Sequence, residues 1–211
     1  MNFDVSTLDS RLRLISIINC AGSTYVNGLS EKLKSCLFEI IALINQRGES
    51  LNFEIDHTVI VLGDSGIRDI VGFNTSKAIS DADFSPFGIM SLGKALEAIK
   101  KICKTPQYTY GGSLAAILLL SDGIFDYEAE SALKSFNSLA EFKHIPKIAV
   151  CSGVIDNSDE HRNLSKFAGD KIFDTLSVQK IAQEIVDSYL DNKDKNASDV
   201  SGSSDDFDLD F

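Results

Sequence analysis

The sequence predicts an α/β fold: a Rossmann-like, doubly wound and mostly parallel sheet of six strands, with one antiparallel edge strand. Two almost wholly apolar segments, residues 14–18 and 115–120, each run into a short polar loop, as expected of central strands covered by helices on both faces. Strand patterns alternate with amphipathic helix patterns, which favours right-handed crossovers and parallel pairing. The turn-rich segment Gly63–Gly66 predicts a hairpin, and the hairpin supplies the antiparallel strand.

Each expected element rests on its own pattern. Strands are expected at 11–19, 53–62, 67–73, 115–120, 147–151 and 172–173. The first helix is expected to begin at Ser23 or Thr24, with Ser23 as a candidate N-cap, and to stop at Gly48. Further helices with one apolar face are expected at 92–103, from Asp126 with an inner face reaching Ala140, at 159–167 and at 178–189.

Composition predicts one domain with a tail. The chain has 211 residues, 44% of them apolar, which is enough for one full core. We expect an N-terminal segment at 1–10, a domain at 11–191 and a flexible acidic tail at 192–211, where apolar residues become scarce. No run reaches the ~18 apolar residues that span a bilayer, and the start does not resemble a secretion signal. A cytoplasmic protein without membrane contact is therefore expected.

The charge restricts the class of partner. A net charge of −11 argues against sequence-independent nucleic-acid binding, which needs Lys and Arg against phosphates. The same charge suits protein partners with basic grooves. The oligomeric state is left open.

Most catalytic and metal patterns are absent from the sequence. The four cysteines have no CxxC spacing and lie in or beside apolar segments, so we expect reduced core thiols. The three histidines form no zinc-binding pattern, and no P-loop, G-x-S-x-G or G-x-G-x-x-G motif is present. Cys20 at a helix start is a weak candidate nucleophile, because no His is near it in the sequence. We therefore expect no catalytic residues.

Small polar residues follow the two most apolar strands. Asn19 and Ser23 come directly after the first strand, and Asp122 ends the strand at 115–120. If these strands are parallel neighbours, the three side chains meet at one rim of the sheet, where open α/β proteins place their ligand sites.

Three motifs resemble the von Willebrand factor A (vWA) domain family in order and spacing. The family's metal-ion-dependent adhesion site (MIDAS) has a D-x-S-x-S loop, a Thr before the second large helix and an Asp after the fourth strand. The corresponding segments here are Asn19-Cys-Ala-Gly-Ser23, Ile89-Met-Ser-Leu-Gly-Lys-Ala-Leu96 and Ser121-Asp122-Gly123. The bacterial TerY-like group, associated with tellurite resistance, is the most similar group and implies a partner in a stress-response or phosphorylation-linked complex.

This resemblance comes with a degenerate metal site. Asn19 stands in place of an anionic Asp, Ala21 removes a hydroxyl, and Met90 offers a soft thioether in place of Thr. Ser23 and Asp122 alone match, and Mg²⁺ needs several hard oxygen ligands. We expect no cofactor; the alternative is a weakly bound Mg²⁺ on Asn19, Ser23 and Asp122. Simple structural roles also stand open: an Asp122-Gly123 turn and a core position for Met90.

The leading functional hypothesis is a non-catalytic protein-binding module. Its partner-binding rim is expected to comprise Asn19, Ser23, Thr24, Phe87, Met90, Asp122, Ile124 and Phe125, with Ile89 in the same apolar patch. In the tail, Phe207, Leu209 and Phe211 alternate with acids, which is typical of an extended docking peptide. The alternatives are a metal-dependent vWA binding protein and, less favoured, a small α/β hydrolase or transferase with Asp122 or Asp126 as base.

Overall fold

A computed structural model describes residues 11–64, 66–72, 75, 77–109 and 114–201, and structural statements below refer to these residues. Six strands form one sheet in the order β3-β2-β1-β4-β5-β6. The strands are β1 (Arg11–Asn19), β2 (Glu54–Gly63), β3 (Gly66–Gly72), β4 (Leu114–Leu120), β5 (Lys147–Cys151) and β6 (Ile172–Asp174). All neighbours are parallel except β2 and β3. The predicted fold class, with its antiparallel edge strand, is confirmed.

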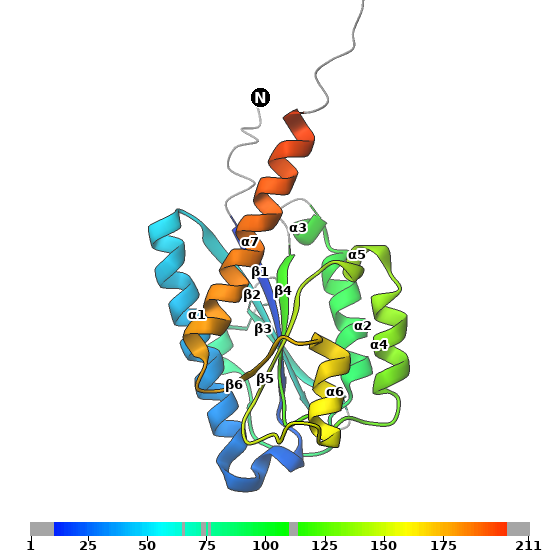
Figure 1. Cartoon of the computed structure of the whole chain (residues 1–211). Coiled ribbons are helices and arrows are strands. Elements are labelled where there is room, and N and C mark those ends of the chain that lie inside the picture. The colour runs from blue at the N-terminus through cyan, green and yellow to red at the C-terminus, as the bar shows by residue number, and fades with distance from the viewer. Residues whose placement is uncertain (1–10, 65, 73–74, 76, 110–113, 202–211) are drawn as a thin grey trace, which may run out of the picture.

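Helices cover both faces of the sheet, with α1 and α7 on one face and α2, α4 and α6 on the other (Figure 1). The helices are η2 (Gly22–Gly28), α1 (Leu29–Leu51), η3 (Ile79–Asp81), α2 (Leu92–Cys103), α3 (Pro106–Thr109), α4 (Ala129–Asn137), α5 (Ala140–Lys143), α6 (Asp159–Ala168) and α7 (Val178–Ser201). Within the described ranges, no helix is both long and apolar enough to cross a lipid bilayer.

The core is split by the sheet into two halves. Leu14 and Ile18 of β1 face α1 and α7, whereas Ile15 and Ile17 face α2 and α4. Both sets are fully buried, which explains why β1 has no polar-apolar alternation. Strands β1 and β4 are hydrogen-bonded neighbours and end at the same edge of the sheet. The loops after them are therefore brought together.

The first helix differs from its sequence prediction at both ends. Ser23 caps no helix; it lies within η2, whose own N-cap residue is Ala21, and Gly28 with φ +65° separates η2 from α1. Gly48 does not stop α1, which ends at Leu51 with Asn52 as its C-cap in the left-handed conformation. A Cβ on Gly48 would lie 2.6 Å from the Phe53 carbonyl oxygen. Gly48 is therefore needed for the close approach of Phe53 and not for termination.

Two other helix predictions need correction. Asp126 does not begin a helix: α4 begins at Ala129, after a turn in which the Ala129 N–H donates to the Asp126 carbonyl. The predicted inner face also fails at Ala140, which is exposed, because the helix breaks at Asn137 and resumes as α5. Phe142 takes the inner position and stacks on Phe136 with ring centroids 4.3 Å apart.

Helix α7 is longer than predicted. It packs on the sheet through Ile181, Ile185 and Tyr189 and then continues to Ser201. Residues 192–201, expected as part of a flexible tail, therefore continue the helix. The docking residues proposed for the tail, at 207, 209 and 211, lie outside the described residues.

Candidate functional site

The loops at the carboxyl ends of the parallel strands form one edge of the molecule, at the bottom of Figure 1. We call them the rim loops and define them as residues 20–28, the turn at Asp64, and residues 82–91, 121–128, 152–158 and 175–177. They include parts of all three motif segments identified from the sequence, while Asn19 ends β1 and residues 92–96 begin α2.

Asn19 is the centre of a buried polar cluster beneath the rim loops. Its side-chain carbonyl accepts a hydrogen bond from the Ala21 N–H at 2.9 Å, and its amide nitrogen donates to Asp122 Oδ1 at 2.9 Å. The backbone N–H of Ala21 can only donate, so it fixes the amide with the nitrogen toward Asp122. Asn19 thus joins the end of β1 to the end of β4 with a neutral donor.

Ser121 completes the cluster, and sequence reasoning gave it no role. Its hydroxyl lies 3.3 Å from the Asn19 amide nitrogen, accepts from the Gly123 N–H at 3.1 Å, and lies 3.6 Å from Met90 Sδ. Ser121 and Met90 are both buried. Met90 is therefore a core contact beneath the rim and not part of an exposed patch.

Two carboxylates of the 121–128 loop are incompletely paired. Asp122 Oδ1 accepts from Asn19 and from the Ile124 N–H at 3.1 Å, but Asp122 Oδ2 is buried without a hydrogen-bond partner. Asp126 Oδ1 is buried without a partner as well. An unpaired buried acceptor costs roughly 1–3 kcal/mol, so two of them in one loop require an explanation.

The cluster does not fit a resident Mg²⁺. Asn19 directs N–H groups toward Asp122, its oxygen is already occupied by Ala21, and the Met90 thioether is a soft ligand. In the part of the chain that the structure describes, no group of three or more His, Cys, Asp or Glu side chains could hold a metal ion. The amide of Asn19 instead supplies a neutral hydrogen-bond donor to Asp122 Oδ1.

The 82–91 loop is attached to the loop after β1 by backbone hydrogen bonds. The Gly22 N–H donates to the Gly88 carbonyl at 2.9 Å, and the Phe87 N–H donates to the Cys20 carbonyl at 2.9 Å. Gly88 has φ +73°, and a Cβ there would lie 2.3 Å from the Asp64 nitrogen. This close crossing holds Phe87 beside the end of β1.

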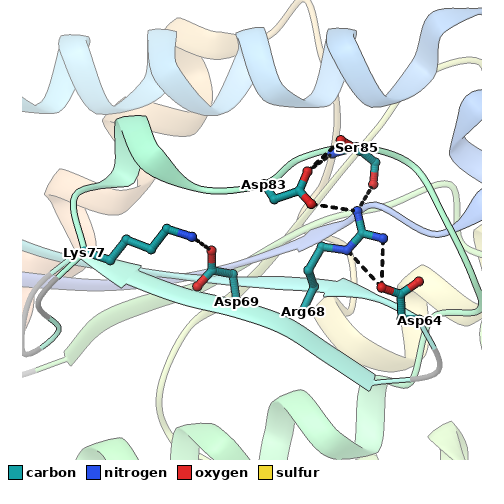
Figure 2. Close-up of polar contacts among 6 residues, drawn as sticks. All are labelled: Asp64, Arg68, Asp69, Lys77, Asp83 and Ser85. Atoms are coloured by element: carbon teal, nitrogen blue, oxygen red, sulfur yellow. Dashed lines mark hydrogen bonds and ion pairs between the residues drawn. The ribbon is translucent and has the colours of Figure 1, made fainter.

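Arg68 fixes the same loop from the edge strand, as Figure 2 shows. Its guanidinium pairs with Asp64 Oδ2 at 2.9 Å and with Asp83 Oδ2 at 3.5 Å, and it donates to the Ser85 carbonyl. Hydrogen bonds from Ser85 hold the pKa of Asp83 below its usual value. Arg68 therefore fastens the loop to β3 and partly neutralises two rim acids.

Apolar side chains are exposed along the rim loops. Eight of the ten exposed large apolar residues in the described part of the chain lie there: Tyr25, Val26, Phe87, Ile89, Ile124, Tyr127, Ile155 and Leu176. Sequence reasoning found Phe87, Ile89 and Ile124 and missed the other five. Their position in otherwise polar loops was the available clue, because such loops rarely need large apolar residues.

The predicted rim residues fall into two layers. Phe87 and Ile124 are exposed, 66% and 51% respectively, and Ser23 and Phe125 are partly exposed. Asn19, Thr24 and Met90 are buried beneath them, and Thr24 donates from its hydroxyl to the Ala21 carbonyl at 2.8 Å. The buried layer cannot contact a partner directly; it holds the outer layer in place.

Cys20, the candidate nucleophile, and the buried His57 both lie in unreactive surroundings. Burial raises the pKa of the Cys20 thiol to about 12, so this thiol stays protonated at neutral pH. His57 lies near the start of β2, at the opposite end of the strand from the rim. Its ring is hydrogen-bonded to Ser16 Oγ at 2.8 Å, and burial lowers its pKa to about 3. Neither residue is prepared for nucleophilic or acid-base chemistry.

No known protein-family model and no curated protein sequence matches the chain. Solved structures do match. The mussel byssus proximal thread matrix protein 1 with a zinc-occupied MIDAS motif has a TM-score of 0.57 and 14% identity over 87% of this chain and 46% of that one. Manganese-loaded Plasmodium vivax TRAP has a TM-score of 0.53 and 12% identity, covering 83% of this chain and 72% of that one.

The pilus adhesin SpaC of Lactobacillus rhamnosus GG also matches, with a TM-score of 0.55 and 10% identity over 87% of this chain and 31% of that one. The chain thus spans less than half the length of the mussel protein and of SpaC. These neighbours are vWA-domain proteins, and at such low identity the likeness concerns the fold alone. The chain has a vWA-like fold.

Proposed function

We propose that this chain is a non-catalytic protein-binding module whose rim loops contact a protein partner without a resident divalent cation. The observation that carries the proposal is the concentration of exposed apolar side chains in the rim loops, compared with two elsewhere among the described residues, Phe38 and Leu51 on α1. Exposed apolar side chains gathered on one edge of a molecule are typical of interaction sites. Adhesion and interaction roles among the vWA-domain neighbours support the same class of function.

The buried layer supports a metal-free rim. Asn19 supplies the donor that Asp122 Oδ1 needs, so the end of β1 and the end of β4 are joined without a cation. Gly88 and Arg68 fix the 82–91 loop. A rigid, apolar surface of this kind pays little conformational entropy on binding.

The test is affinity capture from the native proteome in EDTA, with three forms of the chain. The rim variant combines Phe87→Ser and Ile89→Ser. The control variant is Leu51→Ser, which removes an exposed leucine (51%) at the far end of α1, compared with 66% for Phe87 and 65% for Ile89. A partner captured by the wild type and by the control, but lost with the rim variant, supports the proposal. Equal capture by all three forms contradicts it.

A metal-dependent rim is the second candidate, and the unpaired Asp122 Oδ2 favours it. Here Asn19, Ser23 and Asp122 bind Mg²⁺ weakly, and an acidic residue of the partner completes the ligands. Titration calorimetry with Mg²⁺ and Mn²⁺, alone and with a captured partner, separates the two candidates. Partner binding that needs the ion and disappears in Asp122→Ala would establish this candidate in place of the first.

The TerY-like resemblance extends the proposal to a cytoplasmic stress-response complex linked to tellurite resistance. The residues that support it are the Leu-Ser-Asp-Gly-Ile-Phe-Asp run at 120–126. A captured partner encoded beside tellurite-resistance genes would support this extension, and a partner of unrelated function would oppose it.

The acidic end of the chain is proposed as a second docking element. Phe207, Leu209 and Phe211 alternate with aspartates, so an extended peptide could place three apolar side chains on one side. Capture with a chain ending at Ser201 tests this element while keeping α7 whole. Loss of a partner that the full chain retains supports docking, and an unchanged set of partners contradicts it.

A further inference from the structure

The rim loops are acidic as well as apolar. They contain the acids Asp64, Asp83, Asp122, Asp126, Glu128 and Asp156 and no Lys, Arg or His. Arg68 reaches in from β3 and pairs with Asp64 and Asp83. Among the described residues, no ion pair joins Asp122 or Asp126 to a Lys or Arg. The 121–128 loop therefore keeps an uncompensated negative charge beside Ile124 and Tyr127.

Unpaired oxygens mark the position of this charge. Asp122 is only 8% exposed, and its Oδ2 lacks a hydrogen-bond donor. Asp126 Oδ1, four residues along the same loop, lacks one too. Asp122 is held through Oδ1 by Asn19 and by the Ile124 N–H, so Oδ2 is the carboxylate oxygen that remains for a further donor.

We infer that the partner inserts a Lys or Arg side chain, flanked by apolar residues, whose N–H groups bind Asp122 and Asp126. This inference rests on the proposed function, since it names the chemistry of the partner at the same rim. A bound divalent cation would make this position positive and suited to a carboxylate. With the Asn19 amide in place of a cation, the position stays negative, so the preferred partner charge is reversed.

The experiment selects random peptides displayed on phage against the wild-type chain in EDTA. Enriched peptides are synthesised, and their dissociation constants are measured for four forms of the chain: wild type, Asp122→Asn, the Phe87→Ser/Ile89→Ser rim variant, and Asp156→Asn. Asp156→Asn is the matched control, because it removes one rim charge from a side chain that is 90% exposed and pairs only weakly with His161 at 3.7 Å.

The expected motif is a Lys or Arg beside aromatic or aliphatic residues. Replacing that cation by norleucine or citrulline is expected to weaken binding about tenfold or more, the usual effect of losing a charge-assisted hydrogen bond. Asp122→Asn should weaken the cationic peptide by the same factor and leave the neutral peptide unchanged. Asp156→Asn should change neither by more than about twofold, because exposed charges contribute little.

Folding does not obscure this result. An asparagine at position 122 keeps a carbonyl oxygen for Asn19 and Ile124 and puts an uncharged NH2 group where the unpaired carboxylate oxygen lies, so its melting temperature should stay close to that of the wild type.

The outcomes separate the inference from the proposed function. Peptides that bind the wild type and Asp122→Asn equally, but not the rim variant, overturn the inference and leave the proposed function in place. A parallel selection in Mg²⁺ that enriches peptides rich in Asp or Glu, which bind only with the ion, overturns both. A selection that enriches nothing beyond what the rim variant enriches also overturns both.

Discussion

Asn19→Asp is the substitution that most directly tests the buried cluster. The Asn19 amide nitrogen lies 2.9 Å from Asp122 Oδ1, and Asn19 is fully buried. The substitution changes side-chain volume very little. It replaces a hydrogen-bond donor by a carboxylate oxygen, so two negative groups occupy a gap that is built for a donor and an acceptor.

The size of the effect depends on pH. Two charges ~3 Å apart repel by about 6 kcal/mol at an effective dielectric constant of ~20. The introduced carboxyl can avoid this cost by staying protonated, which raises its pKa in the folded state. Holding that proton costs about 4 kcal/mol at pH 7 and about 1.5 kcal/mol at pH 5, relative to an unfolded pKa of ~3.9. The loss of stability therefore grows as the pH rises.

The assay is urea unfolding at pH 5 and pH 7 in EDTA, followed by circular dichroism because the chain has no Trp. Asn45→Asp, at an exposed position of α1, is the matched control and should change stability by less than ~0.5 kcal/mol. A loss below ~1 kcal/mol at pH 7, or a loss that is equal at both pH values, would refute the placement of the amide against Asp122. In a second series without EDTA, Mg²⁺ should restore stability to Asn19→Asp and leave the wild type unchanged.

Three further predictions concern the elements that support the rim. Gly48→Ala should destabilise the chain by ~1–3 kcal/mol in urea unfolding, because the new Cβ would crowd the Phe53 carbonyl. A gain in stability of ~1 kcal/mol, which is usual for Gly to Ala in a helix, would contradict that contact. Wild-type stability should fall as the pH drops from ~6.5 toward 3, because burial lowers the pKa of His57 to about 3 and only the unfolded chain takes up the proton. His57→Gln should flatten that profile in urea titrations, and parallel profiles would count against it. Arg68→Ala should cost only ~1 kcal/mol of global stability but make the 82–91 loop a site of rapid limited proteolysis, and an unchanged cleavage pattern would show that Arg68 does not hold the loop.

The sheet could be predicted because its patterns are strong. Strands β1 and β4 are apolar without alternation, and the turn formers at Gly63–Gly66 fix the antiparallel edge. Strand ends were placed within about one residue for most strands, since burial on both faces leaves little freedom in the pattern.

Helix ends were harder to predict because contacts distant in sequence decide them. Gly48 has the residue type of a helix stop, but its lack of a side chain instead lets Phe53 pack closely against the helix. Ser23 has the residue type of an N-cap but lies inside η2. No local pattern distinguishes these roles, because each depends on where the next segment returns against the helix.

The candidate site was predictable in position but not in its layers. Parallel pairing of β1 and β4 placed Asn19 and Asp122 together, as the sequence indicated. The burial of Met90 and Thr24, and the role of Ser121, depend on side-chain directions set by the loop crossing at Gly88. Those directions follow from tertiary hydrogen bonds, which sequence spacing does not contain.

The central claim is that the rim loops bind a protein partner with the Asn19 amide in place of a cation. The most direct measurement is the dissociation constant of a rim-dependent partner or selected peptide in EDTA and again in excess Mg²⁺. The account predicts two values within about twofold of each other, because no ion takes part in binding. Binding that appears only with Mg²⁺ would contradict it.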